Sequence, residues 1–136
     1  MIDQLLNIYY SKEEWHKNKL SLDEARKYFE TLLNKGNIIV FLNEEKVLGY
    51  VEFWCVNLHQ LQKIKDNQSF YIGEEDTQHG NICYIHNIWV DESCRGNGVL
   101  KHLKFDIKDK IKHCDYFAGR RIMRDNLMRI KYKGGF

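Results

Sequence analysis

The sequence predicts an α/β domain whose mixed, mostly antiparallel central sheet is flanked by helices. Three observations lead to this fold class: helical spacing in the first third of the chain, two β-rich runs after it, and a strand, bend, helix and strand within residues 81–119. The chain has 136 residues, of which 43% are hydrophobic, enough for one sizeable core. We therefore expect residues 1–136 to form a single domain.

Two capping boxes mark predicted helix starts in the first third. In a capping box a serine hydroxyl binds an early backbone N–H and a glutamate three residues later binds back, as Ser11 with Glu14 and Ser21 with Glu24 would do. After the second box, apolar residues recur on one helix face: Leu22, Ala25, Phe29, Leu32 and Leu33. Gly36 then predicts the end of that helix.

The spacing of apolar residues changes after this glycine. Residues 37–43 and 46–56 carry the β-branched and aromatic side chains of an antiparallel hairpin. Residues 58–68 have weak helical spacing, and residues 69–80 resemble a short strand that runs into an acidic loop.

The second half contains the clearest strand, residues 81–90. Apolar residues at helical spacing then predict a helix that reaches about His113: Val99, Leu103, Ile107 and Ile111. Residues 114–119 are short and apolar, and would return as a strand parallel to the first with the usual right-handed crossover. The tail, residues 120–136, is predicted to be a last basic helix that stops at glycine.

Charge is distributed unevenly along the chain. Residues 1–100 contain 10 basic and 15 acidic side chains, whereas residues 101–136 contain 11 basic and 4 acidic ones, which gives net charges of −5 and +7. The C-terminal quarter should attract anions, although lysine-rich stretches are often only solvated helix faces. No apolar run reaches the length of a membrane span and no signal peptide is evident, so we expect a soluble cytoplasmic protein without membrane partners.

The four cysteines, Cys55, Cys83, Cys94 and Cys114, are scattered along the chain. They form no CxxC pair, and the histidines do not complete a zinc-ligand spacing. Reduced thiols and no metal site are therefore expected.

The bend CRGNGVLKHL, residues 94–103, has few side chains between a strand and a helix. Asn97-Gly98 alone is typical of a hairpin turn, but the residues that follow keep helical spacing and do not alternate as a returning strand would. At the start of a helix, unpaired N–H groups and the helix dipole favour an anion, and Arg95 adds a positive charge. The bend therefore predicts a site for phosphate groups, such as a diphosphate.

The stretch IHNIWVDESCRGNGVLKHL resembles the acetyl-CoA-binding signature of the GCN5-related N-acetyltransferase (GNAT) superfamily, R/Q-x-x-G-x-G/A at the opening of a helix. Leu100 stands where that signature usually has glycine or alanine. The order of predicted elements also follows the family. The ending DNLMRIKYKGGF is similar to a family segment, with Asn126, Tyr132, Gly135 and Phe136 at matching positions but a shorter spacing.

The resemblance implies acetyl-CoA as co-substrate and an amine acceptor. Pantetheine would bind main-chain groups of the signature strand, and the bend would bind the pyrophosphate. The cofactor-binding residues implied in this way are Ile88, Trp89, Val90, Arg95, Gly96, Asn97, Gly98, Val99 and Asn126. Tyr132 matches the family tyrosine that protonates the thiolate of coenzyme A.

Three residues are candidates for the catalytic base. His86 is the first, because imidazole titrates near neutral pH and lies two residues before Ile88. Glu52, within an apolar strand, is the second, and Tyr84 the third. Strand alternation would place His86 on the face of Tyr84 and Ile88, which also suits a packed core histidine.

The family's last two strands normally follow this ending, and here the sequence stops at it. A sheet that ended at residues 114–119 would expose an edge, so a homodimer partner or a rearranged basic tail is expected to cover it. The function implied is transfer of an acetyl group to a primary amine, in a small molecule or a protein lysine, by direct attack in a ternary complex. A non-catalytic acetyl-CoA-binding protein is the alternative; a nucleic-acid-binding module is a weaker one, since the basic tail carries no recognised motif.

Overall fold

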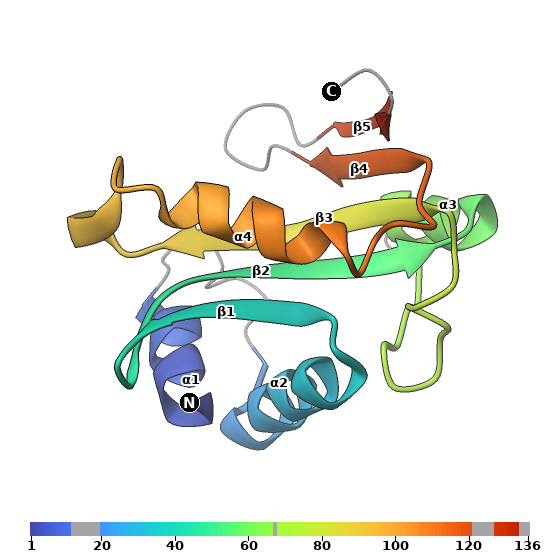
Figure 1. Cartoon of the computed structure of the whole chain (residues 1–136). Coiled ribbons are helices and arrows are strands. Elements are labelled where there is room, and N and C mark those ends of the chain that lie inside the picture. Colours follow the sequence, from blue (N-terminus) through green and yellow to red (C-terminus); the bar gives the residue numbers. More distant parts are fainter. Residues whose placement is uncertain (12–19, 67, 121–126, 134–136) are drawn as a thin grey trace.

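A five-stranded sheet forms the centre of the protein, with helices on both of its faces (Figure 1). In chain order the elements are α1 (Ile2–Ser11), α2 (Leu22–Lys35), β1 (Ile38–Asn43), β2 (Lys46–Val56), α3 (Leu58–Lys65), β3 (Ile82–Val90), α4 (Val99–Lys108), β4 (Tyr116–Arg120) and β5 (Met128–Tyr132). The computed structural model describes residues 1–11, 20–66, 68–120 and 127–133. The strands lie in the order β1-β2-β3-β4-β5, and among the described residues only β3 and β4 run parallel. The predicted mixed, mostly antiparallel sheet flanked by helices is confirmed.

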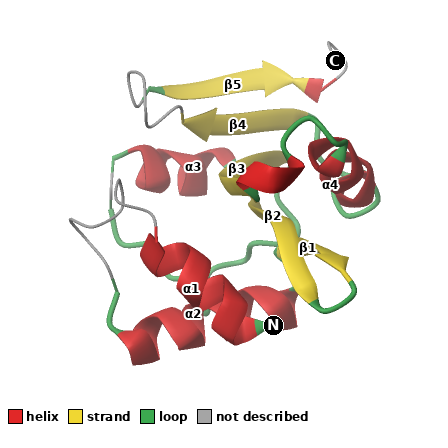
Figure 2. Ribbon diagram, turned by 90° about the vertical axis from the view of Figure 1, so that its left-hand side faces the viewer, coloured by secondary structure: helices red, strands yellow, loops and turns green. Residues whose placement is uncertain are grey.

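The two faces of the sheet carry separate hydrophobic cores. Figure 2 shows α1, α2 and α3 on one side of the sheet and α4 on the other. Side chains of β2 alternate between them, since Tyr50 and Trp54 pack toward α1 and α2, whereas Val51 and Phe53 pack toward α4. We call these sides the α1–α2 face and the α4 face. Within the described segments, no helix is both long and apolar enough to cross a membrane.

The second capping box is present at the start of α2. The Glu24 N–H donates to Ser21 Oγ (3.2 Å), and the Ser21 N–H donates to Glu24 Oε1 (3.1 Å). Gly36 ends the helix with a φ of 73°, in the left-handed region that favours glycine. Ser11, in contrast, is the last residue of α1, and its hydroxyl donates to the Ile8 carbonyl (2.8 Å). The rest of the capping box predicted at Ser11, including Glu14, lies outside the described residues, so a helix that starts there stays a prediction.

The segment between β2 and β3 contains α3 but, among its described residues, no strand. The weak helical spacing correctly predicted α3, whose start is stabilised by a further capping box between Asn57 and Gln60. The expected short strand in residues 69–80 is instead a loop held by buried side chains. Thr77 donates to Asn37 Oδ1 (2.7 Å), and Asn37 donates to the Phe53 carbonyl (2.9 Å), so side-chain bonds replace a strand ladder.

The predicted parallel pair is present. β3 and β4 pair over four residues, from Ile82 opposite Tyr116 to Ile85 opposite Gly119. Helix α4 ends at Lys108, earlier than predicted, and tighter turns carry the chain on to β4. Ile111 in these turns is still 2% exposed, which explains why the apolar spacing continued beyond the helix.

The tail differs most from expectation. Residues 128–132 form β5, which pairs antiparallel with β4, so a final helix there is wrong. Apolar and basic residues alternate along β5, which is the strand period. The chain's own tail thus covers the edge of β4. Of the two arrangements expected, a homodimer partner or a rearranged basic tail, the structure shows the second. A homodimer stays a prediction, which the mass in solution by light scattering would test.

Candidate functional site

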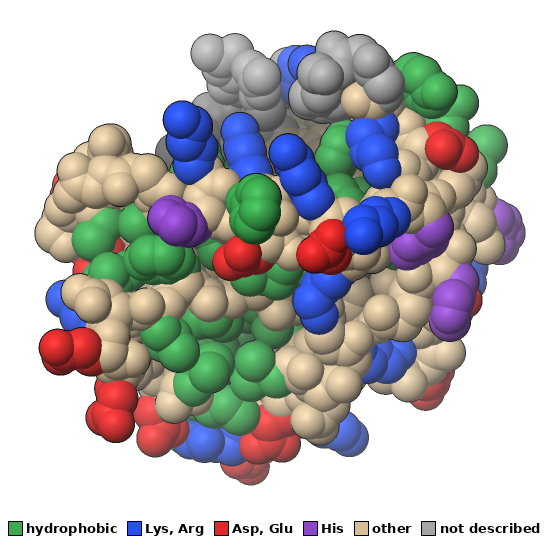
Figure 3. Space-filling model, in the orientation of Figure 1, with side chains coloured by type: hydrophobic (Ala, Val, Ile, Leu, Met, Phe, Trp, Pro, Cys, Tyr) green, Lys and Arg blue, Asp and Glu red, His purple; other side chains and the backbone are tan. Residues whose placement is uncertain are grey.

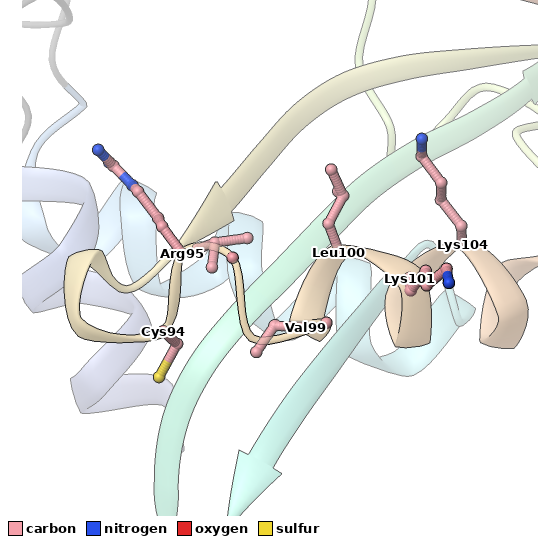
Figure 4. A pocket seen from close by; sticks show the side chains of 9 residues that line it. Cys94, Arg95, Val99, Leu100, Lys101 and Lys104 are labelled. Carbon is pink, nitrogen blue, oxygen red and sulfur yellow. The ribbon is translucent and has the colours of Figure 1, made fainter.

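A cavity of about 400 Å³ lies where β3 meets the start of α4 (Figure 4). Its lining residues are Val90, Cys94, Arg95, Gly96, Gly98, Val99, Leu100, Lys101 and Lys104. Gly98 is the N-cap of α4, so the bend opens a helix and the hairpin interpretation is wrong. The cavity is at the position where the sequence predicted a phosphate site.

The backbone of the bend depends on glycine. Gly96 and Gly98 both have a φ of 87°, a conformation that other residues adopt only with strain. Gly98 has no side chain, so the N-cap of this helix makes no side-chain hydrogen bond to the first turn. The first intrahelical bond runs from the His102 N–H to the Gly98 carbonyl (3.1 Å). The first-turn amides of this ten-residue helix are thus available to an anion.

Positive side chains stand around this helix start. Arg95, Lys101 and Lys104 all line the cavity, and Figure 3 shows lysine and arginine side chains gathered along α4. Leu100, which departs from the family signature, also lines the cavity and is 41% exposed. The arrangement combines main-chain donors, three cations and an apolar wall.

The structure brings most, but not all, of the implied cofactor residues to this cavity. Val90, Arg95, Gly96, Gly98 and Val99 line it. The Asn97 N–H instead bonds back to the Cys94 carbonyl (3.0 Å), and Asn97, Ile88 and Trp89 do not belong to the lining. Asn126, together with Gly135 and Phe136, lies outside the described residues.

The strand that leads to the cavity contains a bulge. Glu52 pairs with Asn87 and Phe53 pairs with Ile85, so His86 is an extra residue in β3. The register between β3 and β4 ends at the same place, at Ile85. Among the described residues, the last five positions of β3 therefore continue beyond the pairing with β4. The resemblance places pantetheine along this part of β3.

The bulge changes which residues share a face. Trp89 lies against Tyr50 on the α1–α2 face (ring centroids 6.0 Å apart), whereas Ile88 pairs with Val51, which belongs to the α4 face. His86 lies against Tyr84 with ring centroids 6.0 Å apart. Alternation correctly placed His86 with Tyr84, but Ile88 is on the opposite side because the extra residue shifts the alternation by one.

His86 and Glu52, the first two candidate bases, lie together on the α1–α2 face. His86 Nε2 is 3.9 Å from Glu52 Oε2. Only 3% of the Glu52 side chain is exposed, and the Tyr28 hydroxyl donates to the same oxygen (2.8 Å). The His86 ring stacks on Trp54, with centroids 4.6 Å apart and planes 17° apart. A buried carboxylate therefore faces an imidazole that is fixed by an aromatic ring.

The surroundings of His86 favour its neutral form. Burial first, and the positive charge of Arg120 second, lower the pKa of His86 toward about 4. Because 41% of the side chain keeps contact with water, we expect its pKa to lie between about 4 and the ordinary 6.5 of histidine. Burial raises the pKa of Tyr84, although Arg120 opposes this shift. Near neutral pH, His86 is thus unprotonated and Tyr84 keeps its proton.

Tyr132 lies away from both groups. It is the last residue of β5 and pairs with Tyr116, which pairs with Ile82 at the start of β3. Along β3, Ile82 is four residues from His86, a separation of roughly 13 Å, and eight residues from Val90, a separation of roughly 27 Å. The Tyr132 ring contacts the Tyr116 ring, with centroids 5.5 Å apart. The structure does not bring Tyr132 to the bend or to the candidate bases.

Sequence reasoning missed several residues of the site. Lys101 and Lys104 could have been found, because they are three residues apart in the first turns of the predicted helix. Tyr28 and Arg120 carried no such signal, since their relation to Glu52 and His86 arises only when α2 and β4 pack beside β2 and β3.

Solved structures share this fold. An N-acetyltransferase from Staphylococcus aureus Mu50 is 20% identical, with 87% of this chain and 66% of that chain covered and a TM-score of 0.56. The ribosomal-protein-alanine N-acetyltransferase from Brucella melitensis is 17% identical, with 87% of this chain and 67% of that chain covered and a TM-score of 0.56. The loading GNATL domain of CurA from Lyngbya majuscula is 9% identical, with 88% of this chain and 59% of that chain covered and a TM-score of 0.59. The chain spans 59% to 67% of these structures, and the likeness concerns the fold.

Comparison of the sequence with protein families gives one match that covers most of the chain. No curated protein matches it. The sequence does match the acetyltransferase (GNAT) family over residues 2–124, which include the sheet up to β4 and the glycine bend. The fold, the end of the β3–β4 pairing at Ile85 and the bend at α4 agree with that match. The protein belongs to the acetyltransferase (GNAT) family.

Proposed function

We propose that the protein transfers an acetyl group from acetyl-CoA to a primary amine, by direct attack of the amine on the thioester in a ternary complex. The observation that carries this proposal is the cavity at the start of α4, where glycines leave main-chain donors open beside three cations. This cavity adjoins the part of β3 that continues beyond β4. An anionic group and an extended chain attached to it would fit the two neighbouring features.

The phosphates of coenzyme A would bind at the bend. The amides of Gly96, Gly98 and Val99 donate to the pyrophosphate, and Arg95 supplies a charge that complements it. Lys101 and Lys104, on the next turns of α4, extend the positive surface along the cavity. From there pantetheine runs along the main chain of residues 88–90, which brings the thioester toward the bulge at His86.

The proton chemistry follows from the lowered pKa of His86. An aliphatic ammonium has a pKa of about 10.4, so a histidine below 6.5 is too weak a base to deprotonate it efficiently. We therefore assign the loss of the first proton to bulk water. The neutral amine then attacks the carbonyl carbon, and the new C–N bond leaves a positively charged nitrogen whose proton is far more acidic.

His86 takes that second proton as the C–S bond breaks. Glu52, 3.9 Å away, stabilises the imidazolium that forms. A thiol has a pKa of about 8.5, so the imidazolium readily gives its proton to the departing thiolate. His86 would act as base and then as acid, and no step requires Tyr132. The acceptor approaches from the α1–α2 face, which carries both groups.

Two measurements on the full chain test the proposal. Calorimetry with acetyl-CoA should give one site, and release of free thiol should follow when a panel of small amines and lysine peptides is added. Substitution of a glycine in the bend should weaken the binding of acetyl-CoA. Gly73→Ala is the matched control for such a variant, because Gly73 lies in a loop outside the cavity lining. Binding without thiol release for any amine would favour the non-catalytic alternative, and absence of binding would overturn the proposal.

A further inference from the structure

Three metal-binding side chains converge on the α4 face, away from the cavity. The ligand atoms of Cys55, His113 and Cys114 all lie within 4.8 Å of one another. Cys55 belongs to β2, whereas His113 and Cys114 lie in the turns between α4 and β4. Along β2, Cys55 is six residues from Gly49, which pairs with Val90 at the cavity, a separation of roughly 20 Å.

The spacing of these atoms suits a zinc ion. Zinc binds thiolate sulfur at about 2.3 Å and imidazole nitrogen at about 2.0 Å, so its tetrahedral ligands lie roughly 3.5 to 3.8 Å from each other. Cys114 Sγ is 3.8 Å from His113 Nε2. We propose that Cys55, His113 and Cys114 bind one zinc ion, with the fourth position occupied by water on the exposed side of His113. Nothing in the proposed acetyl transfer requires this site.

Burial and charge are consistent with a structural zinc site. Cys55 is 2% exposed and Cys114 is fully buried, whereas His113 is exposed and gives solvent access. Two thiolates neutralise the charge of Zn²⁺, so the complex can lie in the core without a net charge. The ion would link β2 to the turns that lead into β4, and so fix the start of that strand.

The groups that face the cluster come from several elements. Lys133 holds the turns from the β5 side through its bond to the Ile111 carbonyl (3.1 Å), and its charge opposes a raised pKa at Cys114. Asp115 acts on Cys114 and Asp76 on Cys55, each raising the thiol pKa. Cys83, on β3, lies beside Cys55 and is the third thiol of this region.

Without metal, both ligand thiols hold their protons. The contact with Cys114 lowers the pKa of Cys55, but Cys83 and burial outweigh it and raise the pKa to about 12. The contact with Cys55, followed by burial, raises the pKa of Cys114 far above that of an ordinary thiol. Even a thiol with the ordinary pKa of about 8.5 is mostly protonated near neutral pH, so binding of zinc by two thiolates releases two protons.

The experiment uses the full chain, free of any affinity tag and kept in a non-thiol reductant. Titration with zinc should give one ion per chain, release of two protons and a higher melting temperature. Replacement of zinc by Co²⁺ should produce thiolate-to-cobalt charge-transfer absorption in the near ultraviolet. His113→Ala should weaken binding at least tenfold without unfolding the protein, because His113 is exposed. His59→Ala, at an exposed histidine of α3, is the matched control and should bind as the unmodified chain does.

Specific outcomes would overturn the proposal. They are zinc binding that His113→Ala leaves unchanged, a cobalt complex without charge-transfer absorption, or no stoichiometric zinc. A Cys55–Cys114 disulfide that persists in the reductant would overturn it as well. Failure of acetyl-CoA to bind would leave the zinc site standing, so the two proposals are tested separately.

Discussion

Substitution of Gly98 separates two properties of the bend, its backbone strain and its access to phosphate. Gly98 has a φ of 87°, and a Cβ built on it would meet no atom within 4 Å. In Gly98→Ala the only cost in the free protein is therefore conformational. Left-handed backbone costs a residue with a Cβ about 1 to 2 kcal/mol, which for a chain of this length lowers the melting temperature by about 3 to 8 °C.

The effect on acetyl-CoA has a different origin. The added methyl group projects from a residue that lines the cavity, where we place the pyrophosphate. Affinity should therefore fall at least tenfold, about 1.4 kcal/mol. Gly98→Asn distinguishes the two effects, because asparagine tolerates the left-handed region better than alanine does while presenting a larger side chain. We expect Gly98→Asn to be more stable than Gly98→Ala but to bind acetyl-CoA no better.

Thermal denaturation of the free protein and calorimetry with acetyl-CoA measure the two effects independently. Gly73→Ala is the control, because a Cβ at Gly73 also meets nothing within 4 Å but its backbone is not left-handed. Its stability should change by less than about 1 kcal/mol and its affinity should not change. Unaltered affinity in Gly98→Asn would refute the placement of the pyrophosphate, and unaltered stability in Gly98→Ala would refute the left-handed bend.

Three further predictions concern the proposed chemistry. Folding lowers the pKa of His86, so the unfolded chain binds more protons than the folded chain between about pH 4 and 6.5. The free energy of unfolding should therefore fall as the pH drops through this window. Denaturation measured as a function of pH should show that His86→Gln removes this part of the fall. Glu52→Gln should lower kcat about tenfold, which corresponds to about 1.4 kcal/mol in activation free energy, and should leave the KM for acetyl-CoA unchanged. Tyr28→Phe should mainly lower the free energy of unfolding, by about 1.5 to 3 kcal/mol, because it removes a hydrogen bond to a charged acceptor. Tyr132→Phe should leave kcat unchanged in the thiol-release assay, since Tyr132 contacts Tyr116 and not the candidate bases; a large loss of kcat would contradict this placement.

Local signals in the sequence predicted the elements whose stability is local. The capping box at Ser21 and the glycine at residue 36 fixed both ends of α2. The helical spacing after Gly98 distinguished a helix start from a hairpin, although Asn97-Gly98 alone favours the latter. Each of these features depends on hydrogen bonds or dihedral angles within a few residues, so the sequence alone was sufficient.

Features that depend on pairing between distant segments were not predictable in this way. Five alternating residues in β5 are too few to outweigh the helical interpretation of the basic tail, and only the exposed edge of β4 makes them a strand. The bulge at His86 carries no glycine or proline signal, because it is defined by the register with β2. The cluster around Cys55 and Cys114 likewise has no sequence spacing, since the two thiols come from different elements.

One distant glycine connects the fold to the candidate site. A Cβ at Gly49 would lie 2.8 Å from Val99 Cγ1 and 3.0 Å from the Trp89 carbonyl, so the start of α4 can approach β2 only over a glycine. Gly49 pairs with Val90, the last residue of β3, and Val99 above it is 5% exposed. The same contact that buries the first turn of α4 therefore holds its open amides beside the end of β3. The phosphate site and the strand that would guide pantetheine are consequently positioned by one packing contact, made by a residue about fifty positions before the bend in the sequence.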